Sequence, residues 1–247
     1  MKDKIVLITG AASGMGAATA RLFASAGSMI VPVDLDEPGL EKIAHEINAE
    51  ISFAGDISDS AFCDSCIDET VTKFGRVDVL VNAAGIIRRT DAINTSDADW
   101  RRVMAVNVDG LFFMSRAAVR HMKAQGAGAI VNFGSIWGGI GVENTLAYCA
   151  SKGAVHQITR AMALDHATDG IRINAVCPGE VNTPMLASQR DNPITQSELQ
   201  ALADATIPMK RLAEPDEVAK VVLFLASSDA SYMTGALVPV DAGYTAR

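Results

Sequence analysis

The chain has 247 residues, of which 49% are apolar and 20% are charged. This balance is typical of a well-cored globular protein and excludes a disordered chain, and the length suits one large α/β domain or two small ones. The net charge of -8 offers no basic surface to nucleic acid or to an anionic membrane. The N-terminus lacks the length and cleavage site of a signal peptide, and no apolar run approaches a membrane span. We therefore expect a soluble cytoplasmic protein.

The first predicted elements are a buried strand over residues 4–9, a glycine turn, and an alanine-rich helix that ends at about residue 26. The turn reads Gly10-Ala-Ala-Ser-Gly14-Met-Gly16. Glycines let the backbone approach a pyrophosphate, and the helix N-terminus offers it unpaired N–H groups and a positive dipole end. The spacing departs from the common G-x-G-x-x-G fingerprint, since Thr19 occupies the place of the last glycine. The pattern indicates a phosphate-binding turn.

A second predicted strand covers residues 28–33 and ends in Asp34. A carboxylate at this position can accept both ribose hydroxyls of an adenosine, and it would repel a 2′-phosphate. No Arg or Lys lies in residues 11–13 or directly after Asp34, so NAD is favoured over NADP. Pro32 conflicts with a central strand, which needs every N–H for its ladder. A bulge or an offset in pairing would accommodate it.

Helices and strands then alternate: a helix over 39–47, a strand over 51–54, a helix over 58–74 and a strand over 77–82. This rhythm predicts parallel pairing in a doubly wound α/β sheet. Asp56 and the run Asn82-Ala-Ala-Gly85 would fall at the carboxyl ends of strands, the edge where open parallel sheets bind ligands. Each of these residues could also belong to an ordinary turn without a ligand.

The four cysteines are too few and too scattered for a disulfide framework. Cys63 and Cys66 form a lone CxxC inside a predicted helix, with no second pair or histidine cluster to complete a metal site. We expect these two residues to pack in the core, and we predict no metal. Cys149 lies next to Tyr148, which is weak support for a nucleophile.

A long helical pattern starts at a cap, Thr95 or Ser96, and ends at about residue 125. Asn107 lies in the middle of this pattern. Asparagine is a poor residue for a helix interior, so Asn107 indicates a kink or a polar role. A buried asparagine whose hydrogen bonds are all made within the core is the alternative.

Reactive side chains gather between residues 135 and 152. Ser135 ends a strand-like run, and a glycine-rich loop leads into a helix from about Leu146 to about residue 168. Tyr148 and Lys152 are four apart and would share a helix face. A free tyrosine titrates near about 10, and a neighbouring ammonium would lower that pKa toward neutral pH. An isolated Tyr-x-x-x-Lys pair can also lie on a solvent-exposed helix face without any catalytic role.

The rest of the chain predicts a strand over 171–177 closed by Pro178-Gly179, a helix over 215–227 and a strand over 237–240. Residues 184–210 lack a clean apolar period, which suggests an irregular substrate lid. No linker or repeat divides the chain. We predict a single domain over residues 1–247, a Rossmann-type sheet of about seven parallel strands with helices on both faces.

Over its whole length the chain resembles the short-chain dehydrogenases/reductases. The matching motifs, in order, are Thr9-Gly10-x-x-x-Gly14-x-Gly16, Asp56-Ile57, Asn82-Ala-Ala-Gly85, the tetrad Asn107, Ser135, Tyr148 and Lys152, and Pro178-Gly179. Ala83 departs from the family's Asn-Asn-Ala-Gly, a change that should be tolerable because the other three positions are kept.

The resemblance implies roles for these residues. Tyr148 would be the general acid/base and Ser135 would polarise the reacting oxygen. Lys152 would hold the nicotinamide ribose and lower the tyrosine pKa, and Asn107 would position a water that connects Lys152 to solvent. A homotetramer, built partly on the two long helices, is also implied. The expected NAD contacts are Gly10, Ser13, Gly14, Met15, Gly16, Asp34, Leu35, Asp56, Ile57, Asn82, Ala83, Gly85, Tyr148, Lys152, Pro178, Gly179, Val181 and Thr183.

The substrate is less constrained, because family membership specifies a reaction better than a substrate. Arg88 and Arg89 follow Gly85-Ile-Ile, and guanidinium groups bind carboxylates bidentately. This run resembles family members that oxidise sugar acids or 2-keto-3-deoxy sugar acids. The expected substrate residues are Arg88, Arg89, Ser135, Trp137, Glu143, Asn144, Tyr148, Met185 and Arg247. A reductase of 3-oxoacyl thioesters or other ketones is the nearest alternative, and a non-catalytic nucleotide-sensing protein is an alternative of another class.

Overall fold

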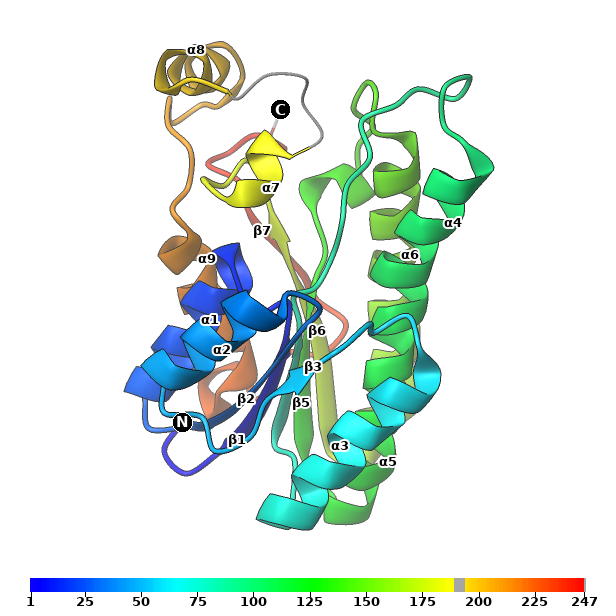
Figure 1. Cartoon of the computed structure of the whole chain (residues 1–247), viewed down its shortest axis with the longest axis vertical. Helices are drawn as coiled ribbons and strands as arrows, with labels where there is room; N and C mark the ends of the chain where they lie inside the picture. Colours follow the sequence, from blue (N-terminus) through cyan, green and yellow to red (C-terminus); the bar gives the residue numbers. More distant parts are fainter. Residues whose placement is uncertain (189–193, 247) are drawn as a thin grey trace.

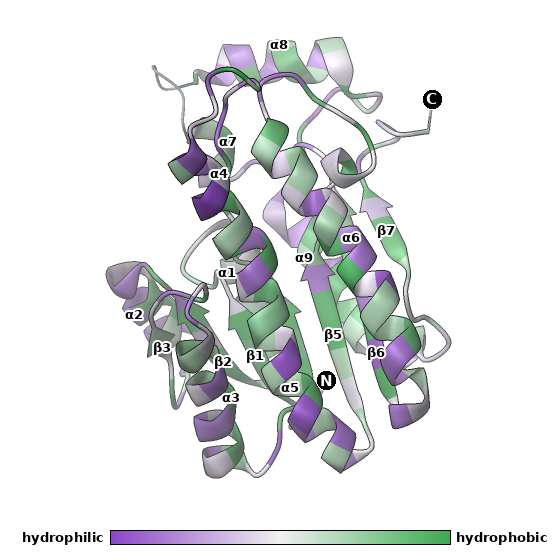
Figure 2. Ribbon diagram, turned by 90° about the vertical axis from the view of Figure 1, so that its right-hand side faces the viewer, coloured by the Kyte–Doolittle hydropathy of each residue, from purple (hydrophilic) through white to green (hydrophobic). Residues whose placement is uncertain are grey.

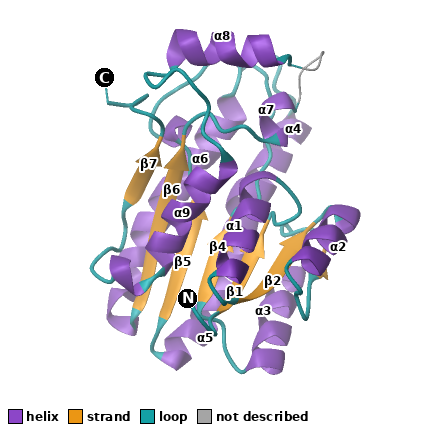
Figure 3. Cartoon of the chain, turned by 90° about the vertical axis from the view of Figure 1, so that its left-hand side faces the viewer, coloured by secondary structure: helices purple, strands orange, loops and turns teal. Residues whose placement is uncertain are grey.

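The computed structural model describes residues 1–188 and 194–246. Its centre is a parallel sheet of seven strands in the order β3-β2-β1-β4-β5-β6-β7, which confirms the predicted fold class. In Figure 3 the strand arrows point toward the end of the sheet where α7 and α8 lie. The strands are β1 (Ile5–Thr9), β2 (Met29–Asp34), β3 (Phe53–Ala54), β4 (Val79–Asn82), β5 (Gly128–Phe133), β6 (Ile171–Pro178) and β7 (Leu237–Val240).

The chain builds the sheet outward from β1 to β3 and then returns to place β4 on the other side of β1. At such a switch point the loops after β1 and β4 diverge and leave a crevice at their carboxyl ends. The nucleotide turn follows β1, and the run Asn82-Ala-Ala-Gly85 follows β4. The topology therefore brings these two motifs to one crevice.

Helices cover both faces of the sheet (Figure 1). One face carries α1 (Gly14–Ser25), α2 (Glu37–Glu46) and α9 (Pro215–Ala226), and the other carries α3 (Ser60–Phe74), α5 (Leu111–Gln125) and α6 (Leu146–His166). Each face has its own apolar core, so the middle strands are buried on both sides and lack alternation, as in β1. Figure 2 shows apolar strands behind helices whose outer faces are mixed.

Cys63 and Cys66 lie in the core between α3 and the sheet, as predicted. Burial raises the pKa of the Cys63 thiol to about 12 and raises the pKa of Cys66 further, so both stay protonated and unreactive. In the described ranges, no helix is long and apolar enough to cross a bilayer.

Pro32 is accommodated without a bulge, because the pairing of β1 with β2 runs in unbroken register through Ile8 and Pro32. Met29 donates its N–H to Lys4 on the β1 side, so by alternation the Pro32 nitrogen faces β3. Pairing with β3 begins only at Val33 and Phe53. The missing N–H therefore faces a stretch with no strand partner, which is where a sheet tolerates proline.

The long predicted helix is one continuous run with a change of pitch at its centre. It consists of α4 (Asp97–Met104), a π-helical segment (Ala105–Gly110) and α5. Ser96 is the N-cap and accepts the Asp99 N–H at 3.0 Å. Asn107 lies within the π-helical segment, so the expected disturbance at this residue is a widened turn, a feature frequent at functional sites.

The prediction of an irregular segment over residues 184–210 was wrong in part. The described residues form α7 (Pro184–Ala187) and α8 (Gln196–Thr206) above the carboxyl ends of the strands (Figure 1). Thr195 and Glu198 make a capping box that starts α8. The apolar period of this helix is short, Leu199, Leu202 and Ala203, and only Ala203 is buried. Residues 189–193 of the expected lid lie outside the described residues.

Candidate active site

Two adjoining cavities open at the carboxyl ends of the strands, and Met15, Thr183 and Met185 line both. The first cavity brings together most of the predicted cofactor residues: Gly10, Ser13, Gly14, Met15, Gly16, Asp34, Leu35, Asp56, Ile57, Ala83, Gly85 and Thr183. The second cavity is lined by Ser135, Tyr148, Pro178, Gly179 and Val181 among others. The two cavities thus separate the nucleotide motifs from the reactive side chains.

The glycine turn forms one wall of the first cavity and is packed without space for side chains. Gly10 has φ +69°, and a Cβ there would lie 2.7 Å from the Ala84 backbone nitrogen. A Cβ on Gly16 would overlap the Gly10 carbonyl group. Ser13 is the N-cap of α1 but makes no side-chain cap hydrogen bond, so the first N–H groups of this helix are open to an anionic ligand.

Asp34 lies at the carboxyl end of β2 and lines the same cavity. One carboxylate oxygen accepts the Ala12 N–H at 2.9 Å, and the other accepts the Asp36 N–H at 3.0 Å. Each oxygen keeps further acceptor capacity. The side chain is therefore oriented by backbone donors and can receive two hydroxyl groups.

Asp56 forms an ion pair with Arg102 at 2.7 Å, and both residues line the first cavity. Burial opposes ionisation of Asp56, but hydrogen bonds from Ser58 and Arg102 outweigh it and hold the pKa of the carboxyl below its usual value. Arg102 was missed by sequence reasoning. It is 46 residues away from Asp56 in the chain, and nothing in a single sequence marks such a pair.

Asn82 does not line either cavity. It is buried, and its Nδ2 donates to Ser115 Oγ and to Asn132 Oδ1, each at 2.9 Å. Asn132 Nδ2 in turn donates to Thr159 Oγ1 at 2.9 Å. The Asn82 amide therefore joins β4 to β5 and α5, and Asn132 extends the network to α6. The expected cofactor contact of Asn82 stays a prediction.

Tyr148 and Lys152 lie one above the other on α6, with Lys152 Nζ 5.6 Å from the centre of the tyrosine ring. Lys152 Nζ donates to the Phe133 carbonyl at 2.7 Å. Burial lowers the pKa of Lys152 to about 8, so most of the ammonium is still protonated at pH 7.

The expectation that Lys152 lowers the pKa of Tyr148 is not met in this structure. Burial raises the pKa of Tyr148 to about 12, although a hydrogen bond with Ser135 acts in the opposite direction. The charge of Glu180 raises the same pKa and the charge of Arg89 lowers it. The proximity of the ammonium was predicted correctly, but the loss of hydration around the phenol is the larger effect.

Ser135 begins a short 3₁₀ turn, Ile136–Gly138, in the loop after β5. Its hydroxyl oxygen accepts the Trp137 N–H at 3.1 Å and shares a hydrogen bond with Tyr148. The Trp137 ring meets the edge of Tyr148 at 6.0 Å between centroids and 84° between planes. Loop and helix thus bring the two hydroxyl groups together.

Asn107 is buried and connects the π-helical segment to the loop that follows β4. Its Oδ1 accepts the Ile86 N–H at 2.8 Å, and its Nδ2 donates to the Ile86 carbonyl and to Ser151 Oγ. A Cβ on Gly85 would lie 3.3 Å from Asn107 Oδ1 and 3.7 Å from Lys152 Nζ. The glycine therefore keeps a side chain out of the space between these two polar groups.

The expected substrate residues separate into two groups. Arg89, Trp137 and Met185 line the second cavity beside Tyr148. Arg88 is turned away and pairs with Asp99 at 2.8 Å.

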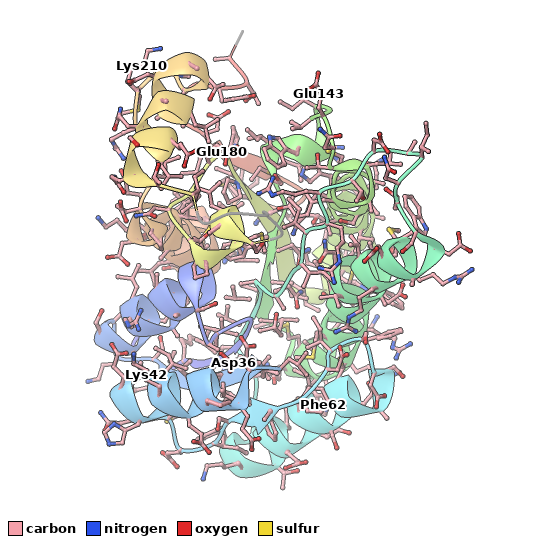
Figure 4. The ribbon with its side chains drawn as sticks, turned by 45° about the horizontal axis from the view of Figure 1, so that its top comes forward. Asp36, Lys42, Phe62, Glu143, Glu180 and Lys210 are labelled. Atoms are coloured by element: carbon pink, nitrogen blue, oxygen red, sulfur yellow. The ribbon has the colours of Figure 1, made fainter. Side chains whose placement is uncertain are left out.

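Glu143 and Asn144 are exposed, line neither cavity, and belong to the loop before α6, where Figure 4 shows Glu143 at the outer tip. Arg247 lies outside the described residues.

Glu180 is a cavity residue that the sequence reasoning missed. It lines the second cavity with Arg89 and Tyr148, and Figure 4 shows it beside the segment that carries α7 and α8. Glu180 follows Pro178-Gly179 at the end of a predicted strand, and this position could have indicated a cavity residue. The second cavity therefore contains both an acidic and a basic side chain.

Comparison with known proteins agrees with this geometry. Residues 10–245 match the family model described as enoyl-(acyl carrier protein) reductase. The chain is 46% identical to a galactitol 2-dehydrogenase (L-tagatose-forming) of Cereibacter sphaeroides, over 96% of this chain and 93% of that protein. It is 42% identical to a meso-2,3-butanediol dehydrogenase of Serratia marcescens, over 99% and 95% of the two chains.

Among solved structures, the chain is similar to a 3-ketoacyl-(acyl-carrier-protein) reductase of Brucella melitensis in complex with NADH. The TM-score is 0.92 at 36% identity, and the match covers 99% of each chain. Fold, site and relatives agree, and the chain belongs to the short-chain dehydrogenase/reductase family as an enzyme of the oxidoreductase class.

Proposed function

We propose that the protein is an NAD-dependent dehydrogenase that acts on a secondary hydroxyl of a small polyhydroxylated substrate. The observation that supports this most directly is the meeting of Ser135 and Tyr148 in the second cavity, next to a first cavity that contains Asp34 and the glycine turn. Bound NAD would supply the hydride acceptor, while the protein supplies orientation and proton transfer.

The first cavity fits NAD better than NADP. The helix N-terminus at Ser13 suits a pyrophosphate, and the oriented Asp34 carboxylate suits two ribose hydroxyls. A 2′-phosphate would meet the charge of Asp34. Arg102 also lines this cavity, but its guanidinium is neutralised by Asp56.

The proton chemistry is assigned to Tyr148. Tyr148 would first release its own proton, and the phenolate would then take the proton of a substrate hydroxyl bound between Tyr148 and Ser135. Because burial raises the pKa of Tyr148 to about 12, the phenolate needs stabilisation at neutral pH, and the Lys152 ammonium is the nearest cation on the same helix. A water that passes this proton to solvent would lie where Gly85 has no side chain, next to Asn107 Oδ1 and Lys152 Nζ.

A neutral polyol or vicinal diol is the substrate class that we favour. Arg89 and Glu180 face the same cavity, so a substrate with several hydroxyls finds both donors and acceptors there. A carboxylate would meet the like charge of Glu180. The named activities of the galactitol and butanediol dehydrogenases are of this kind.

A sugar acid or 2-keto-3-deoxy sugar acid is the second candidate, favoured by Arg89 in the cavity. A panel of polyols, diols, sugar acids and 3-hydroxyacyl thioesters, read as NADH formation at 340 nm, separates the candidates. Arg89→Gln should raise KM for a sugar acid at least tenfold if that acid is the substrate, and should change KM for a polyol less. Activity on 3-oxoacyl thioesters alone would refute both polyhydroxylated classes.

We also propose a homotetramer in the cytoplasm. Large apolar side chains are exposed on the two long helices, including Phe112 at 40% and Leu164 at 80%. Arg116 stacks on Phe112 and Phe113 on this surface. The four cysteines are free thiols, as expected in a reducing compartment, and this supports the cytoplasm as the location. Light scattering should give about four times the chain mass of 26.0 kDa, and the mass of one chain would refute the proposal.

A further inference from the structure

Helix α6 presents a third polar side chain in line with Tyr148 and Lys152. His156 follows Lys152 by four residues, so the three side chains follow one another along one helix face. His156 is only 7% exposed, and its Nε2 lies 3.4 Å from the sulfur of Cys177, which is 4% exposed on β6. The pair lies behind the loop that carries Ser135, on the side away from Tyr148.

The backbone on both sides of Ser135 lies directly against this pair. A Cβ on Gly134 would be 2.8 Å from His156 Nε2 and 3.0 Å from Cys177 Sγ. A Cβ on Gly138 would be 2.6 Å from His156 Cε1. Both positions therefore need glycine, and the loop has no room to move toward the ring.

Polar contacts join the same groups. The Ser135 backbone makes hydrogen bonds with His156 that raise the pKa of the ring and with Cys177 that lower the pKa of the thiol. The influence that favours the imidazolium is that of the Ser135 carbonyl, and the influence that favours the thiolate is that of the Ser135 N–H. Burial, together with the charges of Lys152 and Arg160, still gives His156 a lowered pKa, so the imidazole is neutral at pH 7.

We propose that His156 and Cys177 are positioning residues that hold the Ser135 hydroxyl against Tyr148. Tyr148 is placed by α6, whereas Ser135 is placed by the loop after β5. Without a link, the distance between the two hydroxyls would depend on a loop that contains Gly134, Gly138 and Gly139. Lys152 ties α6 to the Phe133 carbonyl and Trp137 packs on Tyr148, and the histidine ring adds the contact at the Ser135 peptide itself, because it belongs to the helix of Tyr148 and lies against Gly134 and Gly138.

The proposal rests on the proposed function, since it assigns Ser135 and Tyr148 to the reaction. The first test is His156→Leu, measured with the best substrate of the panel. We expect kcat to fall about tenfold to a hundredfold, the scale of a small misplacement of a reacting group, with KM and the Kd for NAD changed less than about twofold. The matched control is His166→Leu, the same change on the same helix at a residue that pairs with Asp169, and it should leave kcat unchanged.

A double-mutant cycle with Ser135→Ala is the decisive measurement. If His156 acts through Ser135, then His156→Leu should reduce kcat less than about twofold in the Ser135→Ala background. An equal loss in both backgrounds, or no loss in the wild-type background, would overturn the proposal.

If His156→Leu does not fold, Cys177→Ala and Cys177→Ser replace it, and each is measured alone and in the Ser135→Ala background. Serine keeps an acceptor for the Ser135 N–H, so only alanine should lower kcat, and equal loss with both would overturn the proposal. Full activity of Ser135→Ala would instead refute the proposed function itself, so the two failures are distinguishable.

Discussion

Replacing Gly16 by alanine tests how closely the nucleotide turn is packed. Gly16 is the third residue of α1 and has no positive φ, so the backbone conformation accepts alanine. The added Cβ would overlap the Gly10 carbonyl oxygen and lie 2.7 Å from the carbonyl carbon and 3.3 Å from the Ala11 Cα. All three are backbone atoms of the turn that follows β1, and they cannot rotate away.

Two opposing effects decide the sign of the change in stability. Alanine is favoured over glycine in a helix by about 1 kcal/mol, and by less in the first turn. Overpacking against atoms that cannot move costs roughly 1–3 kcal/mol or more. For a chain of this length each kcal/mol corresponds to about 2–4 °C in Tm, so we expect Gly16→Ala to lower Tm by about 2–10 °C.

The matched control is Gly141→Ala. Gly141 is exposed in the loop before α6, has no positive φ, and its added Cβ would meet nothing within 4 Å. Calorimetry should show its Tm unchanged. Isothermal titration should show that Gly16→Ala weakens NAD binding at least tenfold, because the displaced turn no longer fits the pyrophosphate, and that Gly141→Ala does not. A higher Tm with unchanged NAD affinity for Gly16→Ala would refute the reasoning.

Three further changes test the chemistry of the site. Tyr148→Phe should reduce kcat by about 10²–10⁴ while NAD binding by titration is kept, and undiminished turnover would contradict the mechanism and leave the sensing alternative. Asp34→Asn should weaken NAD binding about tenfold, because charge-assisted hydrogen bonds to the ribose are lost, and it should improve NADP binding. Titration measures both affinities, and an unchanged preference for NAD over NADP would contradict the role of Asp34 at the ribose. Because the charge of Glu180 raises the pKa of Tyr148, Glu180→Gln should lower that pKa and move the rise of kcat/KM for alcohol oxidation to lower pH. Arg89→Gln should move the same rise to higher pH, and shifts of the same sign for both would show that the charges act elsewhere.

Much of the fold could be predicted because its elements carry local patterns. Continuous apolar runs such as Ile5–Thr9 mark strands that are buried on both sides, and their alternation with helices requires parallel order. The glycine turn, Asp34 and the four-residue spacing of Tyr148 and Lys152 are local as well, so their placement at one crevice followed from the topology. Helix α8 was not predicted because its apolar period is short, and the capping box formed by Thr195 and Glu198 was the sequence signal for its start.

The remaining features depend on contacts between residues far apart in the chain. Arg88 and Arg89 are adjacent and chemically identical, yet only Arg89 reaches the second cavity, because Arg88 pairs with Asp99. Asn82 points into a buried polar network that its motif did not reveal.

The pKa of Tyr148 was misjudged for a similar reason. Spacing along a helix reveals a neighbouring charge, whereas the loss of hydration depends on everything packed around the phenol. The sequence by itself determined the family and the sheet, and it named the candidate reactive groups. Only the tertiary structure decided which charges face the reaction and how burial tunes them, because burial and long-range pairing arise only when the chain is folded.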